Sequence, residues 1–126
     1  MKKLFIWIPA ILWAIIIFYL SAIPNLEATS DPTGNFLTRK AAHIVEYGAL
    51  AIFIYLPTKS FSVSVLLSTL YGATDEFHQN FVPTREFHFS DIGFDFLGSL
   101  VGVAIFVKIP LSKWKSFQTQ AKIQKR

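Results

Sequence analysis

Residues 71–85 read Tyr71-Gly72-Ala73-Thr74-Asp75-Glu76-Phe77-His78-Gln79-Asn80-Phe81-Val82-Pro83-Thr84-Arg85. This stretch places two acids, a histidine, an amide and an arginine at the end of a long apolar segment. Ionisable side chains are costly to hold in such surroundings unless they are paired or face a wet cavity. We therefore expect the stretch to end a membrane-spanning helix and to form part of a functional site.

The composition of the chain is that of a small membrane protein. Of its 126 residues, 52% are hydrophobic and 16% aromatic, and the mean hydropathy is +0.44. A soluble domain of ordinary composition is about 45–50% apolar even with glycine included. The length allows one domain, and the absence of cysteine excludes disulfides, thiolate metal ligands and thiol nucleophiles.

The apolar segments predict an all-α bundle of four transmembrane helices. These helices are expected at about residues 4–20, 40–56, 61–79 and 91–107. The length of the first segment favours a retained helix over a cleaved signal peptide, whose apolar region is about 7–15 residues. Residues 25–38 and 80–90 are expected to be loops, and Ser90 to cap the fourth helix. Residues 1–110 would then form one transmembrane domain.

The charges predict how this bundle is oriented in a cytoplasmic membrane. On one side of a four-helix arrangement lie nine bases and no acid: Lys2, Lys3, Lys59, Lys108, Lys113, Lys115, Lys122, Lys125 and Arg126. All eight acids lie on the other side, with Arg39, Lys40 and Arg85. Basic loops face the cytoplasm, so both termini are expected there. Residues 111–126 would be a basic cytoplasmic tail on the membrane surface, with Trp114, Phe117 and Ile123 inserted.

The same orientation brings polar residues from three helices into one extracytoplasmic layer. They are Lys40, His43 and Glu46 on the second helix, Asp75, Glu76, His78 and Gln79 on the third, and Asp91 and Asp95 on the fourth. Gly98 and Gly102 continue the face of Asp95, and small residues at this spacing allow a close helix contact. That contact would turn Asp95 toward the other helices.

Three interpretations of the polar layer stay open. It is a structural hydrogen-bonded network, or a metal site, or a binding site for an anion. The metal interpretation pairs His43-x-x-Glu46 with Asp75-x-x-His78 on antiparallel helices, with Asp91 or Asp95 as a further ligand. The sequence assigns no cofactor and does not choose among these.

The anion interpretation places Arg39, Lys40 and Arg85 around the carboxylates, which would hold a guanidinium ready for bidentate phosphate binding. The ligand would be a membrane lipid or a lipid-linked cell-wall precursor. In a catalytic version, His43 or His78 is the acid or base, and Glu46, Asp75 or Glu76 sets its pKa. The sorting of charge by membrane side argues against a nucleic-acid partner; a membrane-protein partner or a second copy is a further candidate.

Three blocks of residues resemble the motifs of VanZ-like membrane proteins. They are Lys40-x-x-His43-x-x-Glu46-Tyr47-x-x-Leu50, Tyr71-x-x-x-Asp75-Glu76-x-His78-Gln79-x-Phe81-Val82-Pro83-x-Arg85, and Asp91-x-x-x-Asp95-x-x-Gly98-x-x-x-Gly102. The resemblance implies a small multi-helix bacterial membrane protein, in a family whose founding member is associated with teicoplanin resistance.

The resemblance also carries over a set of site residues, and this chain departs from the family pattern twice. The positions carried over are Lys40, His43, Glu46, Asp75, Glu76, Gln79, Arg85, Asp91 and Asp95. Asp95 stands where the family usually has Asn, which adds a negative charge. Thr84 stands where Gly is common before the arginine, which makes the loop less permissive there.

Overall fold

The structure, a computed structural model, describes residues 2–24, 27, 29–109 and 111–124. All regular secondary structure in these residues is helical, which confirms the expected all-α class. The helices are α1 (Lys2–Phe5), α2 (Ile8–Ser21), α3 (Pro32–Thr58), α4 (Phe61–Gln79), α5 (Phe89–Lys108) and α6 (Leu111–Gln124). α3 packs most extensively against α5 and then against α4, and α2 lies along both α3 and α4.

Three segments of the described chain are long and apolar enough to cross a membrane. They are Lys3–Ser21, Pro32–Thr58 and Phe89–Lys108. α4 has similar length, but its serines, threonines and the polar end from Asp75 to Gln79 lower its hydropathy. The chain therefore has the character of a membrane protein, while four spans and cytoplasmic termini stay predictions.

The first expected helix is divided into α1 and α2 by a turn at Ile6 and Trp7, and the starts of α3 and α5 also differ from the sequence-based expectation. α3 begins at Pro32, so residues 32–38 are helical instead of forming a loop; residues 25, 26 and 28 of that expected loop lie outside the described chain. The early start has a local cause, since the Asp31 carboxylate accepts a hydrogen bond from Gly34 N at 2.8 Å and Pro32 suits the first turn. The predicted cap by Ser90 is wrong, because α5 begins at Phe89 and its N-cap residue is His88.

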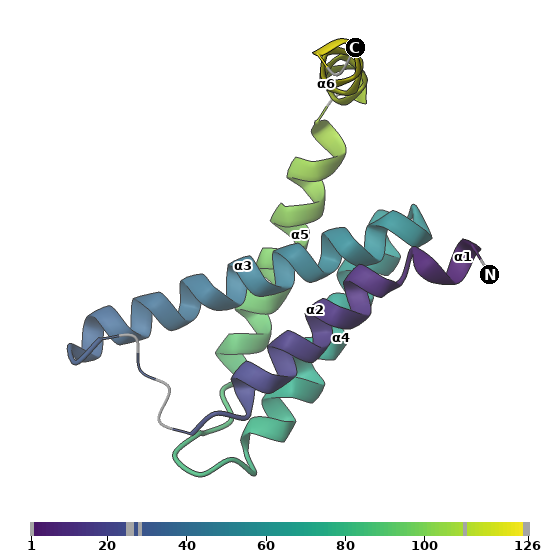
Figure 1. The fold of residues 1–126 in the computed structure, drawn as a ribbon. Helices are drawn as coiled ribbons and strands as arrows, with labels where there is room; N and C mark the ends of the chain where they lie inside the picture. Colours follow the sequence, from purple (N-terminus) through teal and green to yellow (C-terminus); the bar gives the residue numbers. More distant parts are fainter. Residues whose placement is uncertain (1, 25–26, 28, 110, 125–126) are drawn as a thin grey trace.

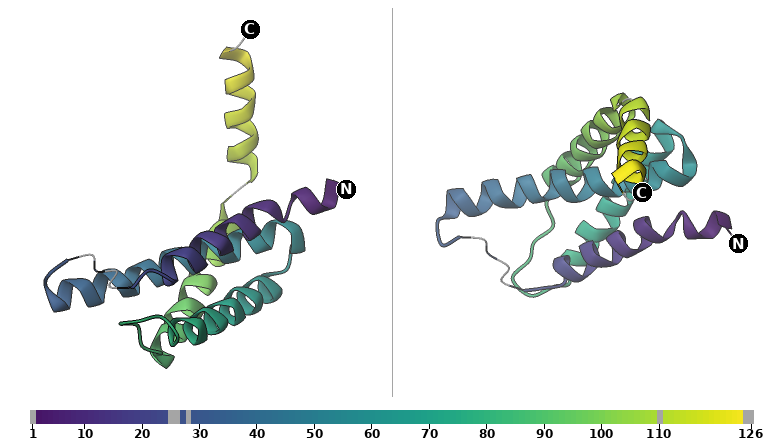
Figure 2. Two further views of the ribbon diagram at one scale, coloured as in Figure 1. Left: turned by 60° about the horizontal axis from the view of Figure 1, so that its bottom comes forward. Right: turned by 45° about the horizontal axis from the view of Figure 1, so that its top comes forward.

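The basic tail forms a helix that stands clear of the bundle. α6 lies beyond the end of α5 and apart from the other helices in Figure 1 and in the left view of Figure 2. Ile123 is exposed, as membrane insertion would require, whereas the side chains of Trp114 and Phe117 lie outside what the structure describes. The position of the tail on the membrane surface stays a prediction.

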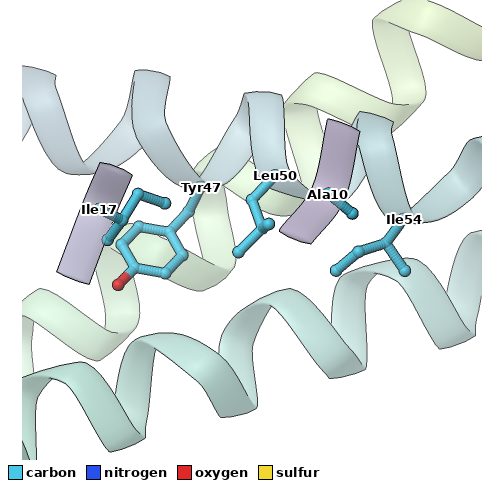
Figure 3. Close-up of a cluster of buried hydrophobic side chains, with 5 residues drawn as sticks. All are labelled: Ala10, Ile17, Tyr47, Leu50 and Ile54. Carbon is cyan, nitrogen blue, oxygen red and sulfur yellow. The ribbon is translucent and has the colours of Figure 1, made fainter. Parts of the chain in front are cut away.

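The apolar core is small and lies between α2 and α3. Its buried members are Ala10, Ile17, Tyr47, Leu50 and Ile54, and Figure 3 shows them between the two helices and above α4. Many large apolar side chains point outward instead, among them Ile15, Leu66 and Ile105. An outward apolar surface of this kind suits contact with lipid, where burial inside the protein is not needed to remove it from water.

Glycines bring α3 and α5 into backbone contact, as the sequence predicts. A Cβ atom at Gly102 would lie 2.7 Å from the Cα atom of Gly48, and one at Gly98 would lie 2.7 Å from the Cα atom of Ile44. Side chains at these positions would push the helices apart. The close crossing carries the first turns of α5, and with them Asp95, to the middle of α3.

Candidate functional site

Five polar residues form a buried cluster where α3, α4 and α5 meet. We call it the His43 cluster; its members are Lys40, His43, Glu76, Asp91 and Asp95. The three carboxylates are at most 1% exposed and His43 is 8% exposed. Polar groups this deeply buried need partners.

Histidine 43 is at the centre of the cluster. Its Nδ1 atom lies 2.7 Å from Asp95 Oδ1 and shares a hydrogen bond with it. Its Nε2 atom faces the other two carboxylates, 3.8 Å from Glu76 Oε1 and 3.7 Å from Asp91 Oδ2. One ring nitrogen is thus held by a close partner, and the other lies near two carboxylates without a close bond to either.

Lysine 40 closes the side of the cluster nearest the start of α3. Its Nζ atom donates to Asp91 Oδ1 and lies 5.1 Å and 5.5 Å from the ring centroids of Phe36 and Phe94. Cation–π contacts of this kind hold an ammonium in place. Asp91 therefore has one oxygen bound to Lys40 and the other turned toward His43.

A glycine on α4 makes room for the cluster. A Cβ atom at Gly72 would lie 2.9 Å from Asp95 Cγ, which is closer than a real Cβ contact allows. Gly72 stands one turn before Glu76 on the same helix face. The absence of a side chain there lets the Asp95 carboxylate reach the space between α3 and α4.

Two carboxylate oxygens in the cluster have no hydrogen-bond partner among the described residues. They are Glu76 Oε1 and Asp95 Oδ2, both fully buried. The other oxygen of Glu76 accepts a long bond, 3.4 Å, from the backbone N–H of His88. An ionised carboxylate oxygen left without donors in a buried place is unusual and calls for a ligand or a proton.

Asp75, the residue before Glu76, forms a separate buried centre that we call the Asp75 node. Its Oδ1 accepts from Ser21 Oγ at 2.6 Å, and its Oδ2 accepts from Gln79 Nε2 at 3.1 Å and Tyr47 OH at 3.3 Å. The donors come from α2, α4 and α3. The node therefore ties three helices together with all its bonds made inside the protein.

A cavity of about 280 Å³ lies next to both centres; we call it the arginine cavity. It is lined by Ile17, Leu20, Ser21, Glu27, Thr38, Arg39, Ala42, His43, Glu46, Asp75, Gln79 and Arg85. A second cavity of about 350 Å³ adjoins it through Glu27 and Arg39 and is bordered by exposed residues such as Ser30 and Phe36. The two together extend from the polar interior to the surface at the start of α3.

Arginine 85 is held differently from the sequence-based expectation. Its guanidinium is expected to be oriented by Asp or Glu, but Nε and Nη2 donate to the carbonyl oxygen of Ile23 and Nη2 also donates to that of Leu20, at 3.1–3.2 Å. These carbonyls lie at the end of α2, where a cation is favoured. Burial lowers the pKa of Arg85, and the nearby charge of Arg39 lowers it further.

Among the described residues, the ligand atoms of His43-x-x-Glu46 and Asp75-x-x-His78 do not form a group that could hold a metal ion. The ring of His78 stacks on Phe18 of α2, with centroids 4.3 Å apart, and Asp75 is used by its node. Glu46 lines the arginine cavity instead. The described residues that offer metal-ligand atoms within 4.8 Å of one another are His43, Glu76 and Asp91.

Most of the residues at these centres are predicted from the sequence, but some supporting residues are not. Ser21 is the closest donor to Asp75, and its only sequence signal is its place at the end of the first apolar segment. Ser68 and Ser99, which bond to each other at 2.8 Å and to Tyr47 O, continue the polar interior below the cluster. Serine is common in helices of membrane proteins, so neither position stands out.

The chain matches one family in a comparison with models of protein families. The model of the family described as VanZ/LLP1 matches residues 5–111. The chain belongs to the VanZ/LLP1 family. Every residue of the His43 cluster, the Asp75 node and the arginine cavity lies inside the VanZ/LLP1 match. No curated protein and no solved structure matches the chain.

Proposed function

We propose that this VanZ/LLP1 protein binds the anionic head group of a lipid or lipid-linked cell-wall precursor in the arginine cavity, on the outer side of the bacterial cytoplasmic membrane. The observation that carries the proposal is that Arg39 and Arg85 line one cavity together with Glu46 and Gln79. Such a cavity offers cations for a phosphate and acceptors for the hydroxyls of a sugar. Processing of the bound group, and an effect on susceptibility to glycopeptides such as teicoplanin, belong to the same proposal.

The two arginines differ in a way that supports this assignment. Arg85 is fixed by backbone carbonyls through Nε and Nη2, and Nη1 has no acceptor among the described residues. Arg39 makes no ion pair within the same part of the chain and borders both cavities. One guanidinium is thus preorganised and the other is available to meet a ligand that enters from the surface.

The position of the cavity supports a ligand that comes from the membrane. The end of α2, the first half of α3, the end of α4 and the start of α5 all meet at the same end of the bundle, where Figure 1 shows both long connections. That end holds the acids together with Arg39, Lys40 and Arg85, while Lys3, Lys59 and Lys108 lie at the far ends of their helices. The positive-inside rule supports placing the cavity end at the outer leaflet, where we propose that it meets the head group of a lipid-linked precursor.

A second candidate function is a structural one, favoured by the Asp75 node. Its three internal donors hold α2, α3 and α4 together without any ligand. In this version the polar layer stabilises a noncatalytic membrane protein that scaffolds cell-wall enzymes. The two functions differ in whether Arg39 matters.

We expect Arg39→Gln to weaken retention of a polyprenyl phosphate by about tenfold or more, because it removes one charge-assisted hydrogen bond to phosphate. Native mass spectrometry of the purified protein, equilibrated with the polyprenyl phosphate and separately with the neutral polyprenol, measures this. Lys108→Gln, which removes an exposed base at the other end of the bundle, is the matched control. Equal retention by both variants, or equal retention of phosphate and alcohol, would exclude head-group binding and leave the structural function.

A further inference from the structure

The His43 cluster offers three ligand atoms to one point. His43 Nε2, a Glu76 oxygen and an Asp91 oxygen lie within 4.8 Å of one another, and all three residues are buried. Ligands of a four-coordinate zinc ion, each about 2.1 Å from the metal, are themselves about 3.4 Å apart. The separations from Nε2, 3.7 Å to Asp91 and 3.8 Å to Glu76, are close to that value and too long for hydrogen bonds.

A buried oxygen without a partner points into the same space. Glu76 is 0% exposed, and its Oε1 atom has no hydrogen-bond partner among the described residues. This is the oxygen that faces His43 Nε2. Leaving a buried carboxylate oxygen unbound costs the free energy of its lost hydration, which a metal ion would recover.

The charge of the cluster fits a divalent cation. Its three buried carboxylates carry three negative charges when ionised, and Lys40 neutralises one of them through Asp91. With His43 in its neutral form, two negative charges are then uncompensated, which is costly in a buried position. One divalent ion balances them.

Asp95 has the position of an outer-sphere partner. Metal-binding histidines commonly give their second ring nitrogen to a carboxylate, which fixes the tautomer and the ring orientation. His43 Nδ1 lies 2.7 Å from Asp95 Oδ1. In the neutral tautomer whose Nδ1–H donates to Asp95, the lone pair is on Nε2, the nitrogen that faces Glu76 and Asp91.

From this geometry we propose that the His43 cluster binds one divalent transition-metal ion of the zinc or manganese class, through His43 Nε2, Glu76 and Asp91. An imidazole with two carboxylates suits these ions better than Mg²⁺ or Ca²⁺, which take all-oxygen sites. The proposed metal ligands differ from the arginines that would bind a head group, because Arg39 and Arg85 are not metal ligands. His43 also lines the arginine cavity, so the ion lies at the edge of that cavity.

The test measures metal binding by the purified full chain, stripped with a chelator and equilibrated with Zn²⁺ or Mn²⁺ alone. We expect about one ion per chain by elemental analysis after desalting, and at least about a tenfold loss of affinity in Glu76→Gln and in Asp91→Asn. Glu86→Gln is the matched control, since Glu86 is an exposed acid in the connection between α4 and α5. Size-exclusion chromatography shows which variants fold.

A second measurement uses the wild-type protein alone, so it does not depend on whether a variant folds. Electron spin-echo spectroscopy of the Mn²⁺-loaded wild-type protein should show coupling to one imidazole nitrogen, which binding by surface carboxylates alone does not produce. The proposal is overturned by wild-type protein that retains no metal, by Glu86→Gln losing as much affinity as Glu76→Gln, or by loaded protein without nitrogen coupling.

Discussion

Asp75 and Glu76 are neighbours in the sequence, and both are buried at the end of α4, yet their carboxylates have opposite surroundings. Asp75 receives three hydrogen bonds from uncharged donors on three helices. Glu76 has one oxygen without a partner and faces an imidazole and two further carboxylates. The protein itself supplies hydrogen-bond donors to both oxygens of Asp75, whereas Glu76 Oε1 needs a proton or a ligand. Burial of an acid alone therefore does not distinguish a structural carboxylate from a ligand-binding one.

Replacement of Asp75 should have the largest effect on stability. Asp75→Ala leaves the donors of Ser21, Tyr47 and Gln79 without their buried acceptor, so we expect a loss of about 3 kcal/mol of folding free energy. Thermal unfolding in detergent and abundance in the membrane measure it. Glu86→Ala, at an exposed position, should leave both unchanged. A stable, abundant Asp75→Ala protein would remove the distinction between the two carboxylates.

A smaller effect is expected from moving α3 away from α5. In Gly98→Ala the new Cβ atom would meet the backbone of Ile44, so we expect a loss of about 2 kcal/mol from overpacking together with weaker metal binding. The Asp75 node does not include α5 and should survive. Gly93→Ala on the same helix is the control, because a Cβ atom there meets nothing within 4 Å and alanine favours the helix. Equal unfolding temperatures for the two variants would contradict the close contact.

The smallest change in stability is expected for Glu76→Gln in the metal-free protein. This substitution keeps the shape of the side chain and removes one charge from a set that carries excess negative charge, so the free energy of unfolding should change by less than about 1 kcal/mol. The stabilisation that the wild-type protein gains from added Zn²⁺ should disappear in the variant. Thermal unfolding with and without the metal measures both. Severe destabilisation of the metal-free variant would show that Glu76 is as structural as Asp75.

Much of the fold follows from local patterns. The apolar segments predict the all-helical membrane class, and the spacing of Gly98 and Gly102 predicts the close crossing of α3 and α5. The start of α3 is missed because residues 32–38 are too polar to read as a membrane helix, although Asp31 and Pro32 are ordinary signals of a helix start. The convergence of polar residues from three helices follows from the short link between α3 and α4 and from the charge distribution.

The grouping within the polar layer does not follow from local patterns. His78 has the spacing of a partner for Asp75, but its ring stacks on Phe18 of another helix. Arg85 donates to backbone carbonyls at the end of α2. Every residue has such a carbonyl, so the sequence gives no sign of this partner. Both outcomes depend on where α2 lies, and α2 is an apolar segment, apart from Ser21 at its end, whose sequence does not indicate which face meets α4.

The sequence by itself determines that this protein is helical, suited to a membrane, and has its acids gathered at one end. Adjacent residues on a helix point about 100° apart, so Asp75 and Glu76 must face different neighbours. Only the tertiary structure decides which one faces His43. It does so because glycines at positions 72 and 98 let α5 approach α4 and α3 closely, which places Asp91 and Asp95 beside Glu76 and leaves Asp75 to the donors of α2 and α3.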